Sequence, residues 1–133
     1  GNSNWRGPVW MPLNCLLIES LYEYHRYYGD GFKVECPVGS GNMATLEQVA
    51  QMLSRRLAGL SLKDENGRRA VMASYPDLVP QADGADLMLF HEYYHGETGA
   101  GLGASHQTGW SGMVALLLQP RRESRRGKLP DCG

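Results

Sequence analysis

The stretch PLNCLLIESLYEYHRYYGDG, residues 12–31, decides the main element of the fold. Pro12 suits the first turn of a helix, where a missing backbone N–H costs nothing. Apolar side chains then recur at steps of three and four residues, until Gly29 and the turn Asp30-Gly31 end the pattern. The sequence therefore predicts a long helix between Pro12 and Gly29. The apolar stripe expected on it consists of Leu13, Leu16, Leu17, Leu21, Tyr24 and Tyr28.

A second helix is predicted from Thr45 to Leu60. Thr45 is a natural N-cap, and Gln48 three residues later completes the pattern of a capping box. Residues 70–84 are expected to be irregular, because Pro76 and Pro80 interrupt regular hydrogen bonding.

The segment ADLMLFHEYY, residues 85–94, fits either a helix or a strand, since its periodicity is compatible with both. A last helix is predicted over WSGMVALLL, residues 110–118, before Pro120. The fold class expected from these elements is mainly α, with helices joined by long irregular loops.

The composition is that of an ordinary globular chain, with 133 residues, 42% of them hydrophobic and 20% charged. No apolar run approaches the roughly 20 residues that a bilayer requires, and no signal peptide is visible, so no membrane partner is expected. The abrupt start on a turn-rich, aromatic run suggests a piece of something longer. Cys15, Cys36 and Cys132 are odd in number and far apart, which argues against a disulfide scaffold or a cysteine zinc site. This pattern favours a reducing compartment, and we predict a cytoplasmic location.

Charge divides the chain unevenly. Residues 1–120 carry 8 basic and 12 acidic side chains, whereas residues 121–133 carry five basic and two acidic ones. The C-terminal segment is predicted to be a solvated, disordered tail. Because no aromatic residues are interleaved with its basic ones, no nucleic-acid partner is expected.

The stretch HEYYH, residues 91–95, matches the H-E-x-x-H motif of zinc hydrolases. In that motif His91 and His95 would share one helical face and bind zinc, with Glu92 as the general base. A catalytic zinc also needs a third protein ligand, but Thr98 and Gly101 stand where the extended motif has Gly and a third His. A zinc hydrolase is therefore kept as an alternative, and no metal is predicted.

The run GAGLGA, Gly99 to Ala104, satisfies the G-x-G-x-x-A pattern of dinucleotide-binding folds. That pattern requires a strand before it and a helix after it, and no βαβ unit fits the remaining length. The sequence therefore predicts no cofactor. A loop so rich in glycine either lets the backbone approach a ligand closely or is a structural Ω-like loop, and both interpretations stay open.

Aromatic and polar side chains gather in the loops. Trp5 and Trp10 flank Arg6 before the first helix, and Trp110 ends the glycine-rich loop. Indole faces stack on the C–H faces of sugars, while planar polar groups bind the hydroxyls. These loops therefore indicate a carbohydrate pocket, although each Trp is also a candidate core anchor. The polar groups available to such a pocket are Arg6, Asn14, His106 and Gln107.

Four stretches together resemble family 63 of the glycoside hydrolases, the processing α-glucosidase family, which includes mannosylglycerate-hydrolase-like bacterial members. The match runs from residue 1 to about residue 118 and is looser to trehalases. The stretches are NWRGPVWMPLN (4–14), HRYYGD (25–30), LEQVA (46–50) and LFHEYYHGETGAGLGASHQTGWSG (89–112). The resemblance implies that residues 1–120 are the C-terminal part of an (α/α)6 toroid, with the rest of the toroid upstream.

The resemblance also implies hydrolysis of an α-glycosidic bond with inversion, in an oligosaccharide or a small glycosyl-glycerate-type substrate. In that chemistry an acid protonates the leaving oxygen while a carboxylate roughly 6.5–9.5 Å away activates water. Glu92 matches the family's general base, whereas the acid, an Asp, would come from an upstream segment. Glu97 and Asp86 are nearby carboxylates that nothing assigns to that role. The residues matching the sugar-binding loops are Trp5, Arg6, Trp10, His106, Gln107 and Trp110.

Three hypotheses follow from the sequence. The first is an inverting α-glycosidase that is inactive as a separate piece. The second is the zinc hydrolase. The third is a carbohydrate-binding protein without catalysis, because no stretch matches the general acid.

Overall fold

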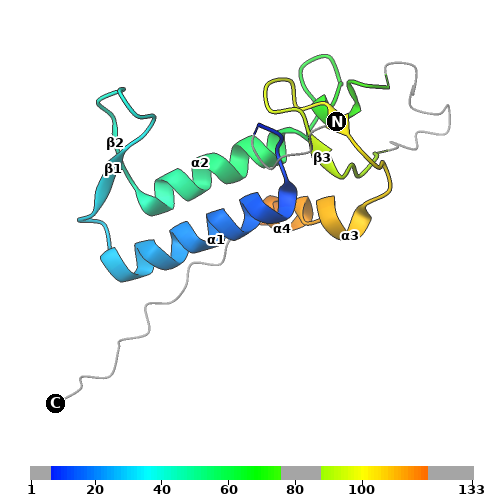
Figure 1. Ribbon diagram of the computed structural model, residues 1–133. Helices are drawn as coiled ribbons and strands as arrows, with labels where there is room; N and C mark the ends of the chain where they lie inside the picture. The colour runs from blue at the N-terminus through cyan, green and yellow to red at the C-terminus, as the bar shows by residue number, and fades with distance from the viewer. Residues whose placement is uncertain (1–6, 76–87, 120–133) are drawn as a thin grey trace.

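Two long helices form the body of the molecule. A computed structural model describes residues 7–75 and 88–119. Helix α1 (Met11–Tyr28) and helix α2 (Leu46–Gly59) lie side by side and run in opposite directions (Figure 1).

Helix α1 begins and ends where the sequence predicts. Pro12 lies in its first turn, and the backbone N–H of Gly29 closes the helix by donating to the carbonyl of His25. The side chains that it buries are Met11, Cys15 and Ile18. Most of the expected stripe lies instead on the open face, where Leu17 is 51% and Tyr24 57% exposed, whereas Leu21 is partly buried against the core. The packing face is set by α2, and the three- and four-residue repeat alone does not select it.

Helix α2 confirms the predicted capping box. The amide of Gln48 donates to the Thr45 hydroxyl at 3.2 Å, and the amide of Thr45 donates to the Gln48 side chain at 2.9 Å. Each side chain thus satisfies a backbone donor that a helix start leaves open. The buried residues of α2 are Leu46, Ala50, Leu57 and Ala58.

A hairpin that the sequence did not predict connects the two helices. Strand β1 (Lys33–Glu35) pairs antiparallel with strand β2 (Met43–Thr45). The Glu35 carboxylate accepts hydrogen bonds from the amides of Gly39 and Gly41, at 2.9 and 2.6 Å. These bonds favour the charged form and lower the pKa of Glu35. They also hold the loop between the strands in one conformation.

A second small sheet lies at the other end of the helix pair (Figure 1). Strand β3 (Tyr93–Tyr94) pairs antiparallel with strand β4 (Gly101–Leu102), and Val9 pairs with Tyr94 on the other side. Val9, β3 and β4 thus bring segments about 90 residues apart into one sheet. We call residues 88–107 together with Val9 the Glu92 loop unit. Within the described residues 88–94 of the predicted helix-or-strand segment, Tyr93–Tyr94 form a strand and no helix is present.

Short elements complete the described chain. A 3-10 turn η1 (Ala70–Met72) packs against β4, and helices α3 (Thr108–Ser111) and α4 (Val114–Leu118) follow the loop unit. The single helix predicted over 110–118 is thus divided between α3 and α4 at Gly112–Met113.

The predicted fold class, a mainly α chain forming the C-terminal part of an (α/α)6 toroid, is wrong. Over residues 7–75 and 88–119 the chain combines helices with two antiparallel two-stranded sheets, which is a mixed α and β architecture. Strands β1 and β2 lie between the two predicted long helices, and β4 lies in the stretch expected to be a glycine-rich loop, whereas β3 falls in the helix-or-strand segment. Strands of two or three residues are too short for alternation to reveal them.

One core unites the helix pair and the loop unit. It is built from Met11, Cys15, Ile18, Ala50, Leu57, Val71, Tyr94 and Val114. Cys15 is buried there as a free thiol, and burial together with nearby Glu19 raises its pKa. Cys36 is also free. Within the described ranges, none of the helices is both long and apolar enough to cross a membrane.

Candidate functional site

Glu92 is held at the edge of the β3–β4 sheet by its own backbone. Its amide donates to the carbonyl of Ala104 at 2.8 Å, directly beyond the last pair of the hairpin. Its half-buried side chain folds back over the same segment, where the Ala104 amide donates to Oε2 at 3.4 Å. Among the described residues, the Ala104 amide is the one hydrogen-bond donor to this carboxylate. Glu92 therefore retains acceptor capacity for a water or a ligand hydroxyl.

Gly103 explains why the carboxylate can lie so close to the loop. A side-chain carbon at Gly103 would stand 2.6 Å from Glu92 Oε2 and 2.9 Å from the Tyr93 ring. Its φ of +71° is also a conformation that other residues rarely adopt. One glycine of the GAGLGA run thus makes room for the Glu92 side chain.

Trp10 and Tyr93 form a stacked pair of aromatic rings near Glu92. Their rings stack with centroids 4.8 Å apart and an interplanar angle of 29°. Trp10 is only 5% exposed, whereas Tyr93 is half-buried. The pairing of Val9 with Tyr94, by bonds of 2.8 and 2.9 Å, fixes Trp10 in this place. Trp10 thus anchors the core while presenting Tyr93 to the surface.

His91 lies on the interior side of the unit. It is fully buried, its ring stacks on Tyr75 at 5.6 Å, and it meets Tyr94 edge-on at 6.2 Å. The Ser111 hydroxyl donates to its carbonyl. Burial, with His106 as a second cause, lowers the pKa of His91, so the ring is neutral at pH 7.

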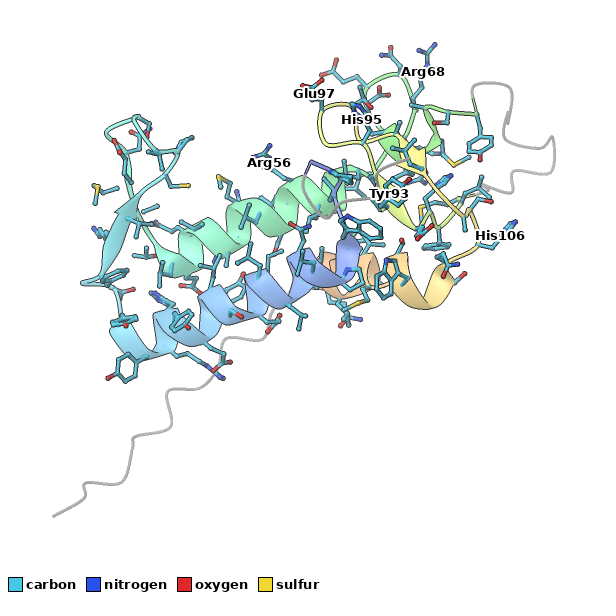
Figure 2. The ribbon with its side chains drawn as sticks, viewed as in Figure 1. Arg56, Arg68, Tyr93, His95, Glu97 and His106 are labelled. Carbon is cyan, nitrogen blue, oxygen red and sulfur yellow. The ribbon has the colours of Figure 1, made fainter. Side chains whose placement is uncertain are left out.

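His95 is exposed, in contrast to the buried His91. Its Nδ1 accepts from the amides of Glu97 and Thr98, both at 3.3 Å, which closes the turn between β3 and β4. Figure 2 shows His95 and Glu97 together at this turn, well away from His106.

The helix required by the zinc alternative is not formed. HEYYH is extended, with Tyr93–Tyr94 in a strand, and one of its histidines is buried while the other is exposed. Over the described part of the chain, no group of three or more His, Cys, Asp or Glu side chains is arranged to hold a metal. His91 and His95 therefore serve the hairpin.

His106, Gln107 and Trp110 follow the loop unit closely. His106 is exposed and bridges to Phe90, while the Gln107 amide donates to the Phe90 carbonyl at 2.7 Å. Trp110 is half-buried in α3, and its indole N–H has no hydrogen-bond partner among the described residues. The structure thus brings Glu92, Trp10 and this second segment into one region.

Other predicted positions lie elsewhere. Trp5, Arg6 and Asp86 fall outside the described residues, as does the tail 121–133. Asn14 is turned to its own helix, where its side-chain amide donates to the Trp10 carbonyl at 2.9 Å.

Sequence reasoning missed Tyr93, an aromatic ring that lies close to Gly103 together with Glu92. The signal was available, because Tyr93 directly follows Glu92 and HEYYH is followed by Gly96 and the glycine-rich loop, which favour a hairpin. A strand interpretation would have paired Glu92 with the glycine-rich loop.

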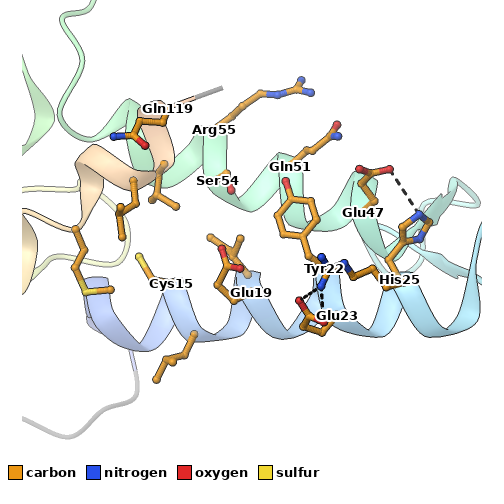
Figure 3. A pocket seen from close by; sticks show the side chains of 16 residues that line it. Cys15, Glu19, Tyr22, Glu23, His25, Glu47, Gln51, Ser54, Arg55 and Gln119 are labelled. Atoms are coloured by element: carbon orange, nitrogen blue, oxygen red, sulfur yellow. Dashed lines mark hydrogen bonds and ion pairs between the residues drawn. The ribbon is translucent and has the colours of Figure 1, made fainter. Parts of the chain in front are cut away.

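A hollow of about 940 Å³ lies between α1, α2 and α4, apart from the Glu92 loop unit. Figure 3 shows its polar end, where His25 Nε2 is 3.6 Å from the Glu47 carboxylate and Arg26 pairs with Glu23 at 2.7 Å. The apolar end includes Cys15 and Leu117. No residue predicted for the site lines it, and the His25–Glu47 pair serves to join α1 to α2.

Comparison with known proteins identifies one relative. The chain is 49% identical over 120 residues to the uncharacterized protein YMR196W of Saccharomyces cerevisiae. The match covers 89% of this chain and 11% of that protein, so the chain spans about a tenth of the relative's length. No family model matches the chain, and no solved structure matches it.

The resemblance to glycoside hydrolase family 63 is therefore wrong as a family assignment. No model of any family matches this sequence, and the matching yeast protein carries no glycosidase name. In the structure the described part of NWRGPVWMPLN leads into α1, HRYYGD ends α1, LEQVA begins α2, and the stretch 89–112 forms the Glu92 loop unit and α3.

Proposed function

We propose that the Glu92 loop unit binds a carbohydrate and that Glu92 acts as the general base in the hydrolysis of an α-glycosidic bond with inversion. The observation that carries this proposal is the setting of the Glu92 carboxylate. The carboxylate is half-buried beside Tyr93. Among the described residues, its one hydrogen-bond donor is the amide of Ala104, at 3.4 Å. A carboxylate of this kind is able to accept a proton from water.

Aromatic rings beside the carboxylate support a sugar ligand. Tyr93 is held in place by its stack on Trp10, so its ring is an ordered surface for the C–H face of a sugar. His106 and Gln107 are exposed one segment away and offer hydrogen-bonding groups for hydroxyls. In this proposal the stacking surface is Tyr93, with Trp10 behind it.

An inverting reaction also requires a general acid roughly 6.5–9.5 Å from the base. We assign that role to none of the described residues. Glu97 belongs to the exposed turn of the β3–β4 hairpin, and Asp86 lies outside the described part of the chain.

Binding is tested on the 133-residue chain, and hydrolysis is tested on a longer protein that contains this chain together with the segment supplying the general acid. Both tests use a panel of α-glucosides, including oligosaccharides and a glycosyl-glycerate. Binding is followed by calorimetry, and the anomeric form of the first product is followed by NMR. The account expects binding, and hydrolysis that releases the inverted β-anomer.

Binding without turnover would remove the catalytic half of the proposal and leave a carbohydrate-binding protein. An α-anomer as first product would contradict the role of Glu92 as a base that activates water. The absence of binding across the panel would contradict the proposal as a whole.

A further inference from the structure

His91 is a polar side chain in the interior of the Glu92 loop unit. It is fully buried, and both ring nitrogens lack a partner among the described residues. Leaving such a group unpaired destabilises the folded state. The proposed function does not use this ring, so its position needs another explanation.

The ring of His91 fills the space between two segments of the Glu92 loop unit. A side-chain carbon at Gly101, in β4, would overlap the His91 ring, so the ring rests directly on that backbone. The Ser74 hydroxyl donates to the Gly101 carbonyl at 3.2 Å, and Tyr75 stacks on the outer face of the ring. His91 thus holds β4 against the segment that carries Glu92.

The groups that face His91 come from several elements. They are the His106 ring from the segment after β4, the Tyr75 ring from the segment after η1, the Tyr94 ring from β3 and the Ser111 hydroxyl from α3. None of these described groups is a carboxylate. A positive charge on His91 would therefore be buried without a counter-charge among these described groups, and His106 disfavours it further.

We propose that His91 is an acid-sensitive lock for the Glu92 loop unit, closed while its ring is neutral and opened when the ring takes up a proton. Opening separates β4 and Ala104 from β3, and it removes the backbone contact that positions the Glu92 carboxylate. The regulation of the site by this lock depends on the proposed function, whereas the opening itself does not.

The direction of the pH dependence follows from burial. The pKa of His91 is lowered in the closed unit and returns to the ordinary histidine value of about 6.5 when the unit opens. The open unit therefore binds more protons below that value. The lock contributes its full stability above about pH 6.5 and loses it progressively as the pH falls.

The experiment is an NMR titration of the intact chain from pH 8 to pH 4. We expect the amide signals of Glu92 and Ala104 to move to open-chain positions with a midpoint below about pH 6.5, while those of Ala50 and Leu57 in α2 stay in place. His91→Phe keeps a ring that cannot be protonated, and it should lower the midpoint by about one pH unit or more.

His95→Gln is the matched control, because His95 belongs to the same HEYYH stretch but is exposed. It should leave the midpoint unchanged. His106→Gln removes one cause of the lowered pKa of His91, so it should lower the midpoint of opening by a smaller amount. If His91→Phe does not fold, the shift of this midpoint in His106→Gln tests the proposal.

The proposal is overturned if the midpoint is the same with or without the His91 ring, or if His95→Gln shifts it equally. An unchanged midpoint in His106→Gln would overturn it when His91→Phe cannot be measured. Loss of sugar binding or turnover alone would count against the proposed function and would leave this NMR transition in place.

Discussion

In the α1–α2 helix pair, side chains such as Met11 and Ile18 fill the interface, whereas in the Glu92 loop unit the closest approaches are made at glycines. The helix pair is stabilised by apolar area removed from water. The loop unit depends on the absence of side chains at Gly101 and Gly103, where His91 and Glu92 occupy the space. The two ends of the molecule should therefore respond to opposite kinds of substitution.

The helix pair should be most sensitive to loss of volume. Ile18 is 1% exposed in the core, so Ile18→Ala should lower the free energy of unfolding by about 3–4 kcal/mol. Its neighbour Leu17 is 51% exposed, and Leu17→Ala should change it by less than about 0.5 kcal/mol. Urea unfolding followed by circular dichroism measures both. Equal losses in the two variants would show that the exposed face of α1 contributes as much to the stability as the buried face.

The loop unit should be most sensitive to added volume. The methyl group of Gly101→Ala would overlap the His91 ring. This variant should therefore lower the free energy of unfolding by about 2–3 kcal/mol in the same urea experiment. Gly109, in α3, has open space around it. Gly109→Ala should therefore be neutral or stabilising by up to about 1 kcal/mol. If Gly101→Ala were as harmless as the control, the packing of His91 on β4 would be disproved.

Hydrogen bonds at the two ends should show a smaller contrast. Thr45 is buried and caps α2, so Thr45→Ala should cost about 1 kcal/mol. Thr98 accepts a 3.3 Å bond from Ala100 in an exposed turn, so Thr98→Ala should cost only about 0.3 kcal/mol. Thermal unfolding of both variants compares them directly. A larger loss of stability in Thr98→Ala than in Thr45→Ala would contradict this prediction.

The sequence was sufficient for the boundaries of α1 and α2, whereas the helix predicted over residues 110–118 is divided between α3 and α4. Pro12, Gly29 and the Thr45–Gln48 pair act within one turn of chain, and the structure has them where the pattern predicts. The buried face of α1 was not predictable in the same way. Apolar residues surround much of that helix, so the choice of Ile18 over Leu17 depends on where α2 packs.

The loop unit was less predictable for a different reason. Its contacts join Val9, Glu92 and Ala104, which are far apart in sequence and meet through single backbone pairs. Glycine spacing indicated a close approach in GAGLGA without showing that Glu92 and His91 were the approaching groups. The match to H-E-x-x-H misled in the same region, because two tyrosines between the histidines fit a strand as well as a helix.

The central claim is that the Glu92 carboxylate activates water for hydrolysis, and a single pair of variants tests it most directly. The pair is made in a protein that also supplies the general acid. Glu92→Gln keeps the size of the side chain, so it should retain sugar binding while lowering kcat for α-glycoside hydrolysis by about 10²–10⁴-fold. Glu97→Gln removes a carboxylate from the exposed turn of the same hairpin and should leave kcat unchanged. Turnover by Glu92→Gln close to that of the unmodified chain, or an equal loss in Glu97→Gln, would contradict the account.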